Sequence, residues 1–478
     1  MVNSQEVTLV IDGIQVKAKK GTPIIEVARQ IGVEIPTLCY LPRLSAFASC
    51  RICIVEITTP TGRKRIVTSC NYPAENGLIV DTKSERVLRN RRKVLELLLA
   101  RCPKVPRIRE LAAMYGVKET NLWVENESED CILCGLCVRV CSEIIGVSAI
   151  NFANRGINRV VTTPYNEFSD DCIGCGACAM VCPTGSKRVR TNNYSTVRPL
   201  TGPNKDENLG AYIDILSAKS SIERQDGGVV TALLLSGLER GFFDKAVVVK
   251  RVSGYKAEAF IAENAEDIIA ARGTEYLRVK IIPKLKELIG EGHRKIAVVG
   301  TPCQARAARK IQQTLQQEHP DLDMTIIGLF CYEAFNYEKL KEEAKRILGI
   351  DLDSSEKTQI REGKFIATIN GQIYSCKVNE LSKAIENGCL YCGDFPALFA
   401  DISVGAVGSE EGYSTVILRT EKGKKLFESA NLTLGQVKVD EIAKYAALKK
   451  NRAKENFAPL VQEIRKIRSY SKRSEENV

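Results

Sequence analysis

The feature that most constrains this chain is a pair of cysteine runs within residues 130–185. "CILCGLCVRVC" and "CIGCGACAMVCP" share the spacing C-x2-C-x2-C-x3-C. Runs of this spacing wrap 4Fe-4S clusters, and where two of them pair, the fourth cysteine of each run ligates the other cluster. A zinc ribbon, the alternative, does not need two complete runs. We therefore predict one cluster on Cys131, Cys134, Cys137 and Cys182, and another on Cys172, Cys175, Cys178 and Cys141.

The rest of the composition agrees with ligation by sulfur. The 478 residues include 18 cysteines but only two histidines, His293 and His319. So few histidines disfavour mixed Cys/His zinc sites, a HExxH protease and a Rieske centre. The N-terminus lacks a basic segment followed by an apolar one, and no apolar run approaches the roughly 18 residues of a membrane span. We expect a cytoplasmic protein that does not span a membrane, with thiolates used for metal ligation or redox chemistry rather than disulfides.

Positive charge is concentrated in residues 83–109 and 444–473, in a chain of net charge +11. Such stretches are either solvated helix faces or docking surfaces for an acidic partner or an anionic cofactor. The chain has one Trp and no common nucleic-acid-binding signature, so we predict no nucleic-acid partner.

The first 80 residues predict a small β-rich domain. "EVTLVID" and "GIQVKAKK" meet across Asp12-Gly13 as a hairpin, and "TPIIEVARQIG" predicts a helix capped by Thr22. Strand, strand and helix is how a β-grasp domain begins. Four cysteines follow, and a 2Fe-2S cluster needs four thiolates. We predict such a cluster, with a zinc site as the alternative, on Cys39, Cys50, Cys53 and Cys70.

This block resembles the 2Fe-2S ferredoxin module of the complex I large iron-sulfur subunit and of related hydrogenases and formate dehydrogenases. The resemblance lies in C-x10-C-x2-C, in "PRLS" inside the long gap, and in "CRICIVEI". In that family one His and three Cys follow and imply a further cluster. Here "LELLLARCPKVPRIRELAAMYGV" has no His and only Cys102, so we predict a helical segment without a cluster.

After a polar, Gly/Pro-broken linker the composition changes to buried strands alternating with helices, an α/β pattern. Six phrases between residues 210 and 430 resemble the coenzyme F420 hydrogenase/dehydrogenase beta-subunit family. They are "QDGGVVTALL", "RGTEY", "VVGTPCQA", "GLFCYEAF", "GCLYCGDF" and "DISVGAVGSEEGYSTVILRT". The resemblance implies an FAD and a third 4Fe-4S cluster close to it. Oxygen sensitivity and an anaerobic host are further expectations from the family.

Four cysteines in these phrases form the set that we assign to this third cluster: Cys303, Cys331, Cys389 and Cys392. Cys303 lies at the start of a predicted helix, where a thiol pKa can be depressed, so a nucleophile is one alternative. No nearby His is available as a base, and a packing role is the other alternative. Cys376, like Cys102, has no assigned role.

The flavin site is predicted from the same resemblance, since neither G-x-G-x-x-G nor a P-loop is present. We place FAD near Gln225, Gly227, Gly228, Thr231, Gly273, Thr274, Gly300 and Thr301. Glycines in plain turns are the alternative explanation. Asp401, Gly405, Ser409 and Ser414 are further candidates for the flavin or substrate cleft, and Lys250, Arg251, Arg272, Arg278 and Lys280 for the anionic tail of F420.

Electron counting gives the expected mechanism. Clusters carry single electrons and a deazaflavin carrier gives or takes a hydride, so FAD stands at the junction and no catalytic side chain is required. We expect electrons to move between coenzyme F420 and a catalytic partner subunit like formate dehydrogenase, hydrogenase or heterodisulfide reductase. The alternatives are a ferredoxin-dependent flavoenzyme that reduces another small substrate, and a pure electron-transfer scaffold.

The predicted fold class is multidomain α+β and α/β. The expected order is a β-grasp 2Fe-2S ferredoxin (1–80), a helical segment (81–125), a two-cluster ferredoxin (126–190) and a linker (191–209). An α/β flavin-binding region follows in two parts (210–325 and 326–440), the second with FAD and a 4Fe-4S cluster, before a basic C-terminal helix or tail (441–478).

Overall fold

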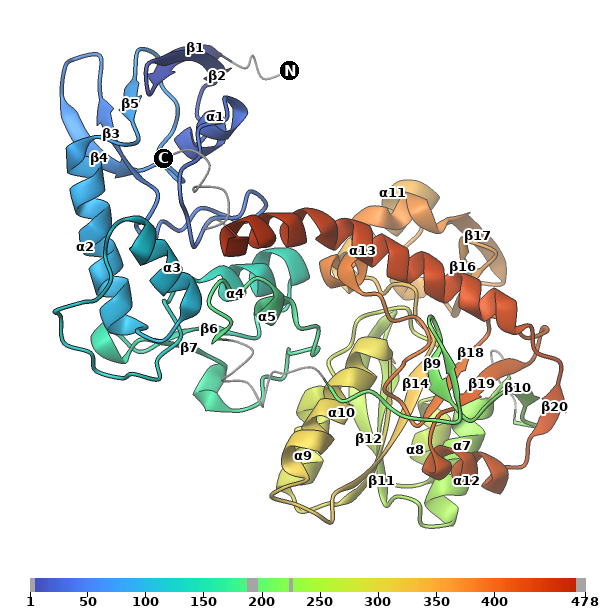
Figure 1. Cartoon of the computed structure of the whole chain (residues 1–478). Coiled ribbons are helices and arrows are strands. Elements are labelled where there is room, and N and C mark those ends of the chain that lie inside the picture. Colours follow the sequence, from blue (N-terminus) through green and yellow to red (C-terminus); the bar gives the residue numbers. More distant parts are fainter. Residues whose placement is uncertain (1–4, 187–196, 223–226, 470–478) are drawn as a thin grey trace.

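A computed structural model describes residues 5–186, 197–222 and 227–469 of the chain. Figure 1 shows the N-terminal third at one end, a large α/β sheet at the other, and helix α13 (Val439–Ser469) running between them. Gln225 lies outside the described residues. No helix in the described ranges is both long and apolar enough to cross a membrane.

The N-terminal sheet has five strands in the order β2-β1-β5-β3-β4. The predicted hairpin is confirmed, since β1 (Glu6–Ile11) pairs with β2 (Ile14–Lys19) across a two-residue turn. The other strands are β3 (Ile54–Thr58), β4 (Lys64–Thr68) and β5 (Ile79–Asp81). Helix α1 (Ile24–Gln30) packs its apolar face on this sheet, and Pro23 precedes it as N-cap, one residue later than predicted.

Two helices connect this sheet to the paired cysteine runs. Ser84 caps α2 (Glu85–Arg101), and α3 (Pro106–Met114) begins with a proline. The basic stretch here is partly internal, because Arg91 is buried and donates to the carbonyls of Ile52 and Ile54 at 3.1 and 2.8 Å. Cys102 ends α2 in the apolar core, where burial raises its pKa to about 12.

The two cysteine runs fold as loops that each lead into a short helical turn. Gly135 and Gly176 adopt left-handed backbone conformations (φ 71° and 74°) directly before α4 (Leu136–Arg139) and α5 (Ala177–Met180). A π-helix (Val140–Ile145), the hairpin of β6 (Asn151–Ala153) and β7 (Val160–Thr162), and the short 3-10 turns Gly156–Asn158 and Pro164–Asn166 complete this part.

The α/β part is built on an eight-stranded sheet of order β12-β11-β13-β14-β18-β19-β10-β20. Its central strands β11 (Lys245–Ser253), β13 (Lys295–Gly300), β14 (Asp323–Leu329) and β18 (Ile402–Gly405) are parallel. The remaining strands pair antiparallel with the strands beside them; they are β12 (Lys256–Ala262), β19 (Ser414–Leu418), β10 (Asp214–Lys219) and β20 (Thr433–Gly435). Buried strands alternating with helices, as predicted for this part of the chain, are thus present, with β11 and β13 among them.

Helices cover both faces of this sheet. Successive residues of a strand point to opposite faces, so neighbouring valines of one strand pack against different helices. Val248 and Val299 pack with α7 (Val229–Glu239), α8 (Ala265–Ala270) and α12 (Glu421–Ser429). Val247 and Val298 pack with α9 (Ile282–Gly290) and α10 (Pro302–Leu315) on the other face.

An insertion between β14 and β18 adds a smaller unit. It contains α11 (Tyr337–Leu348), a three-stranded sheet of β15 (Lys357–Arg361), β16 (Lys364–Ile369) and β17 (Gln372–Lys377), and the 3-10 turns Leu352–Ser354, Val378–Ala384 and η6 (Asn387–Tyr391). Cys376 is buried in its core. In the expected linker, β8 (Asn204–Asp206) forms a hairpin with β9 (Gly210–Tyr212), while residues 191–196 lie outside the described ranges.

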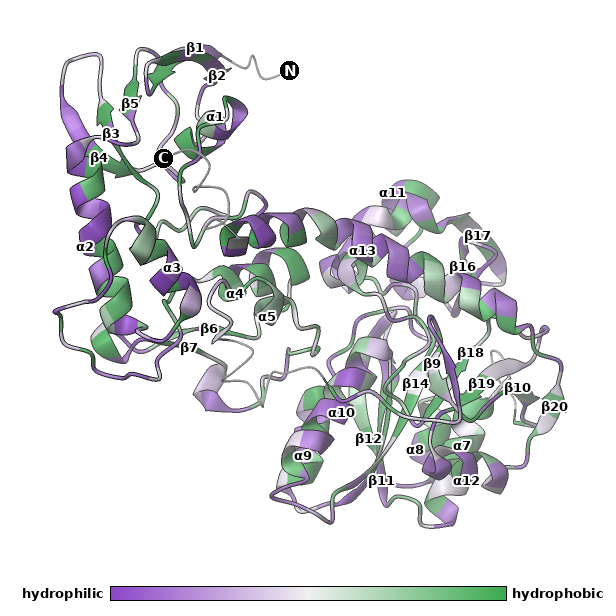
Figure 2. Cartoon of the chain, viewed as in Figure 1, coloured by the Kyte–Doolittle hydropathy of each residue, from purple (hydrophilic) through white to green (hydrophobic). Residues whose placement is uncertain are grey.

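Helix α13 carries polar and apolar residues along its whole length (Figure 2). Its buried apolar positions, spaced at three, four or seven residues, are Ile442, Ala446, Ala453, Leu460, Ile464 and Ile467. This spacing forms one stripe on a helix. The last three join the core around the paired cysteine runs. Up to residue 469, where the described residues end, the basic C-terminal segment is therefore a helix with a buried face.

Candidate functional site

The four N-terminal cysteines lie together at the edge of the first sheet. Cys53 precedes β3 and Cys70 follows β4, which pairs with β3, while Cys39 and Cys50 come from the long loop. All four are at most 3% exposed. A hydrogen bond from Cys50 lowers the pKa of Cys39 to about 6, and a bond from Cys70 likewise lowers the pKa of Cys53. This donor set fits the predicted 2Fe-2S cluster, whose ligands are thiolates.

The paired runs exchange their fourth cysteines, as the prediction requires. One cavity is lined by Cys131, Cys134, Cys137 and Cys182, the last from the second run. Cys141 of the first run lies instead among Cys172, Cys175 and Cys178, whose charges interact with it. The arrangement gives two sets of four thiols, each fit for a 4Fe-4S cluster.

The third set forms where two parallel strands end. Cys303 follows β13 and Cys331 follows β14, and neighbouring parallel strands bring their carboxyl ends to the same edge of the sheet. Cys389 lies in η6 and Cys392 directly after it, and both interact electrostatically with Cys303 and Cys331. Burial raises the pKa of Cys303, which disfavours the nucleophile alternative.

These sets follow one another through the molecule. Arg306 of α10 lies between the third set and the second run: its charge interacts with Cys392, Cys175 and Cys303, and its side chain packs against Gly174. The two ferredoxin-like sets meet where Cys178 and Cys137 interact.

The last junction leads to the N-terminal set. Cys134 interacts with Cys39, and Arg139 donates to the carbonyls of Cys39 and Cys134 at 2.8 and 3.2 Å. These contacts between neighbouring sets give their order in the molecule. The third set lies next to the set of the second run, which lies next to the set of the first run, which in turn lies next to the N-terminal set.

All eighteen cysteines are free thiols, and Cys102 and Cys376 belong to none of the four sets. No three His, Cys, Asp or Glu side chains in the described ranges converge tightly enough to hold a single metal ion.

Of the predicted flavin residues, Gly227, Gly228, Gly300 and Thr301 lie in the loops after β10 and β13, Thr231 lies in α7, and Gly273 and Thr274 lie in the loop after α8. Gly228 is the N-cap of α7, after β10, and Gly300 and Thr301 join β13 to α10. No side chain of the described residues caps α7, so no side chain takes up its first backbone N–H groups, and a helix start of this kind can bind an anion. Gly227 is also required by packing, since a Cβ there would lie 2.5 Å from the backbone nitrogen of Ser414. The Thr301 hydroxyl is engaged in a capping box with Gln304.

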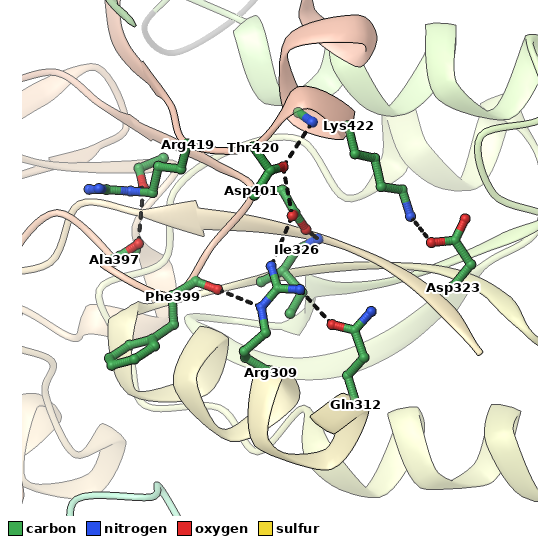
Figure 3. A network of polar contacts seen from close by, with 12 residues as sticks. Arg309, Gln312, Asp323, Ile326, Ala397, Phe399, Asp401, Arg419, Thr420 and Lys422 are labelled. Atoms are coloured by element: carbon green, nitrogen blue, oxygen red, sulfur yellow. Dashed lines mark hydrogen bonds and ion pairs between the residues drawn. The ribbon is translucent and has the colours of Figure 1, made fainter. Parts of the chain in front are cut away.

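Asp401, a candidate for the cleft, is instead a structural residue, as Figure 3 shows. It is 3% exposed and pairs with Arg309 at 2.9 Å. It also accepts hydrogen bonds from the Ile326 backbone at 2.8 Å and the Thr420 hydroxyl at 2.9 Å. With both carboxylate oxygens engaged, this residue ties β14, α10 and the start of α12 together.

Three cations suggested for the coenzyme tail are paired within the protein. Arg251 pairs with Glu275 at 3.0 Å, and Arg278 lies 3.6 Å from Glu386. Lys280 pairs with Asp171 at 2.6 Å and so joins the α/β part to the second cysteine run.

Sequence reasoning missed Lys449 and Arg452 of α13, which contact the third set. Lys449 Nζ donates to the Cys331 carbonyl at 2.5 Å, and Arg452 donates to the carbonyls of Tyr332 and Cys389, each at 3.2 Å. Burial lowers the pKa of Lys449, but the neighbouring thiolates outweigh it and leave the pKa raised. The apolar stripe of α13 was the signal that one face of this helix is internal.

Family models match four parts of the chain. A 2Fe-2S iron-sulfur cluster binding domain matches residues 4–85, and a 4Fe-4S dicluster domain matches residues 130–186. The N-terminal part of the coenzyme F420 hydrogenase/dehydrogenase beta subunit matches residues 215–286, and its C terminus matches residues 293–444. The coenzyme F420 hydrogenase subunit beta of Methanothermobacter thermautotrophicus is 32% identical over 273 residues, 52% of this chain and 95% of that protein. This chain belongs to the coenzyme F420 hydrogenase/dehydrogenase beta-subunit family.

Other relatives of this beta-subunit family member belong to oxidoreductase systems. The coenzyme F420-dependent sulfite reductase of Methanocaldococcus jannaschii is 39% identical over 250 residues, which are 50% of this chain but only 39% of that protein. A chain of the F420-reducing NiFe hydrogenase complex from Methanosarcina barkeri superposes with a TM-score of 0.51 at 31% identity, over 53% of this chain and 94% of that chain. In the present chain, two iron-sulfur domains thus precede the family region.

Proposed function

We propose that this chain moves electrons between coenzyme F420 and a partner redox enzyme through one 2Fe-2S and three 4Fe-4S clusters. The observation that carries the proposal is the unbroken order of the four cysteine sets, from Cys303 within the family region to Cys39 in the N-terminal domain. A relay needs such an order, because each cluster must lie next to the one that it exchanges electrons with.

FAD is proposed at the sheet edge beside the third set, with Gly228, Thr231, Gly273, Thr274, Gly300 and Thr301 around it and Gln225 and Gly227 nearby. When bound, a flavin exchanges electron pairs with a hydride carrier and single electrons with clusters. The chain's own contribution is to hold the rings, to offer the backbone N–H groups of α7 to phosphate, and to keep the thiolate loops in place.

The remaining assignments follow from this arrangement. We assign the N-terminal domain to the β-grasp class, from its five-stranded sheet and packed helix, and keep the seven-part division given above. The partner is a catalytic subunit of the formate dehydrogenase, hydrogenase or heterodisulfide reductase type, which meets the end of the chain that holds the 2Fe-2S cluster. The complex is proposed to be cytoplasmic.

A second candidate function is a flavoenzyme that passes ferredoxin electrons to another small substrate. The sulfite reductase relative supports the small-substrate part of this function, although that relative is itself F420-dependent. The two functions differ in whether reduced coenzyme F420 donates electrons to this chain.

Anaerobic purification followed by iron, sulfide and flavin quantification tests the cofactor content. One 2Fe-2S and three 4Fe-4S clusters give about 14 iron atoms per chain, with one FAD. Rapid oxidation of reduced coenzyme F420 with a viologen acceptor is then expected. Full cofactor content without this activity would support the second function, and absence of FAD would contradict both.

A further inference from the structure

The face of α13 that passes the third cysteine set is polar and follows the sulfur-bearing segments. Lys449 contacts the Cys331 carbonyl, and one turn later Arg452 contacts the Cys389 carbonyl. Asn456 then donates to the Leu390 carbonyl at 2.8 Å, and Phe457 packs on Tyr391 with ring centroids 4.9 Å apart. Residues at these spacings lie on one face of a helix, so this face of α13 contacts both the segment that carries Cys331 and the segment of residues 389–391.

Lys449 is the unusual member of this face. It is 1% exposed, and among the described residues it forms no ion pair with a carboxylate within 4.0 Å. An ammonium has three donors, and burying one without an opposite charge is strongly unfavourable. Arg452, by contrast, pairs with Glu333 at 2.8 Å. The negative charge near Lys449 is that of Asp394, which lies beyond ion-pair distance, and, when a cluster is bound, that of the thiolates of Cys331, Cys389 and Cys392.

We propose that Lys449 is the charge-compensating, positioning residue of the cluster assigned to Cys303, Cys331, Cys389 and Cys392, and that it raises the reduction potential of this cluster. Each added electron makes the cluster more negative, so a fixed buried positive charge stabilises the reduced form. The family match ends at residue 444, so Lys449 lies outside the part of the chain that the family defines. The inference rests on the proposed function, because it needs the third cluster to be present.

The test is an EPR-monitored redox titration of the purified, cluster-loaded chain. Lys449→Met removes the charge at nearly constant length, and Lys449→Arg keeps the charge. Lys450→Met is the matched control, because the neighbouring Lys450 is 34% exposed and pairs with Glu207 at 2.9 Å. We expect Lys449→Met to lower the equilibrium constant for reduction of this cluster by about tenfold, a shift of about 59 mV to more negative potential. Lys449→Arg and Lys450→Met should remain near the wild type.

The outcomes separate this inference from the proposed function. A wild-type chain without the third cluster's EPR signal contradicts the proposed function itself. With the signal present, an unchanged potential in Lys449→Met, or an equal shift in Lys450→Met, overturns the role of Lys449. Loss of this cluster alone in Lys449→Met supports the role when Lys449→Arg retains the cluster, and overturns it when Lys449→Arg loses the cluster as well.

Discussion

At the scale of single residues, cations lie at the contacts between the cysteine sets; Arg139 and Lys449 are buried, and Arg306 is half-buried. Arg139 joins the N-terminal set to the first run, Arg306 joins the second run to the third set, and Lys449 faces the third set from α13. Charge interactions are strongest where water is excluded. These three residues are therefore placed to offset the negative charge of thiolate-ligated clusters and to fix the loops that carry them.

Arg306 is predicted to control the step between the third cluster and the ferredoxin-like pair. Its guanidinium pairs with Asp394 at 3.4 Å, and its charge also interacts with Cys392, Cys175 and Cys303 of the two neighbouring sets. Arg306→Gln should slow this electron transfer about tenfold in freeze-quench EPR, by weakening the charge compensation. Arg306→Lys, which keeps the charge, should retain most of the rate. Equal rates in the Gln variant and the wild type would contradict this role.

Cysteines inside and outside the sets should differ in their effect on iron content. Cys134→Ser is expected to remove about four iron atoms per chain, because it breaks the ligand set of one 4Fe-4S cluster. Cys102→Ala and Cys376→Ala should keep the wild-type iron content, since both thiols are buried in apolar cores and neither belongs to one of the four sets. Loss of iron in Cys102→Ala or Cys376→Ala would instead show that the substituted cysteine is a cluster ligand outside the four assigned sets.

A substitution at Gly227 tests whether this glycine is needed for packing or for contact with the flavin. A methyl group at this position would meet the backbone and hydroxyl of Ser414 at 2.5 Å, so Gly227→Ala should lower the free energy of unfolding by about 1–3 kcal/mol. Gly290→Ala is the control, since nothing lies within 4 Å of a Cβ there. Denaturant unfolding measures the loss. A stable Gly227→Ala chain that lacks FAD would instead place this glycine against the flavin.

At the scale of elements, α13 is the helix that connects the family region to the iron-sulfur domains. Its first half lies along the third cysteine set, and its second half enters the core around the paired runs. Near its end, Arg468 donates to the Cys182 carbonyl at 2.7 Å, and Glu463 pairs with Arg29 of the N-terminal domain at 3.3 Å. One rigid element thus contacts every domain that carries a cysteine set.

Loss of packing along this helix should weaken the attachment of the iron-sulfur domains. Leu460 is 1% exposed in the shared core, and Leu460→Ala should lower the free energy of unfolding by about 2–5 kcal/mol through the cavity it leaves. The control is Leu448→Ala, because Leu448 lies on the same helix and is 49% exposed. Equal unfolding midpoints for Leu460→Ala and Leu448→Ala would contradict the role of α13 in attaching the iron-sulfur domains to the family region.

At the scale of the whole molecule, the sequence predicts local sulfur chemistry better than the contacts between distant segments. The exchange of Cys141 and Cys182 between the runs follows from spacing alone, and the structure brings both thiols to the expected sets. Lys449 and Cys331 are 118 residues apart in the sequence, and no sequence motif predicts the hydrogen bond from Lys449 to the Cys331 carbonyl. Asp401 fell in a family-like phrase, but its role in the core depends on Arg309 and Thr420 from other elements.

The central claim is that one continuous relay joins the flavin end to the 2Fe-2S end, and its direct test follows the last cluster. Reduced coenzyme F420 is added anaerobically to the wild type and to Cys303→Ser, and the EPR signal of the reduced 2Fe-2S cluster is recorded over time. The account predicts prompt reduction in the wild type and none in Cys303→Ser, although dithionite still reduces the cluster in that variant. Equally fast reduction of the 2Fe-2S cluster by reduced coenzyme F420 in both proteins would contradict it.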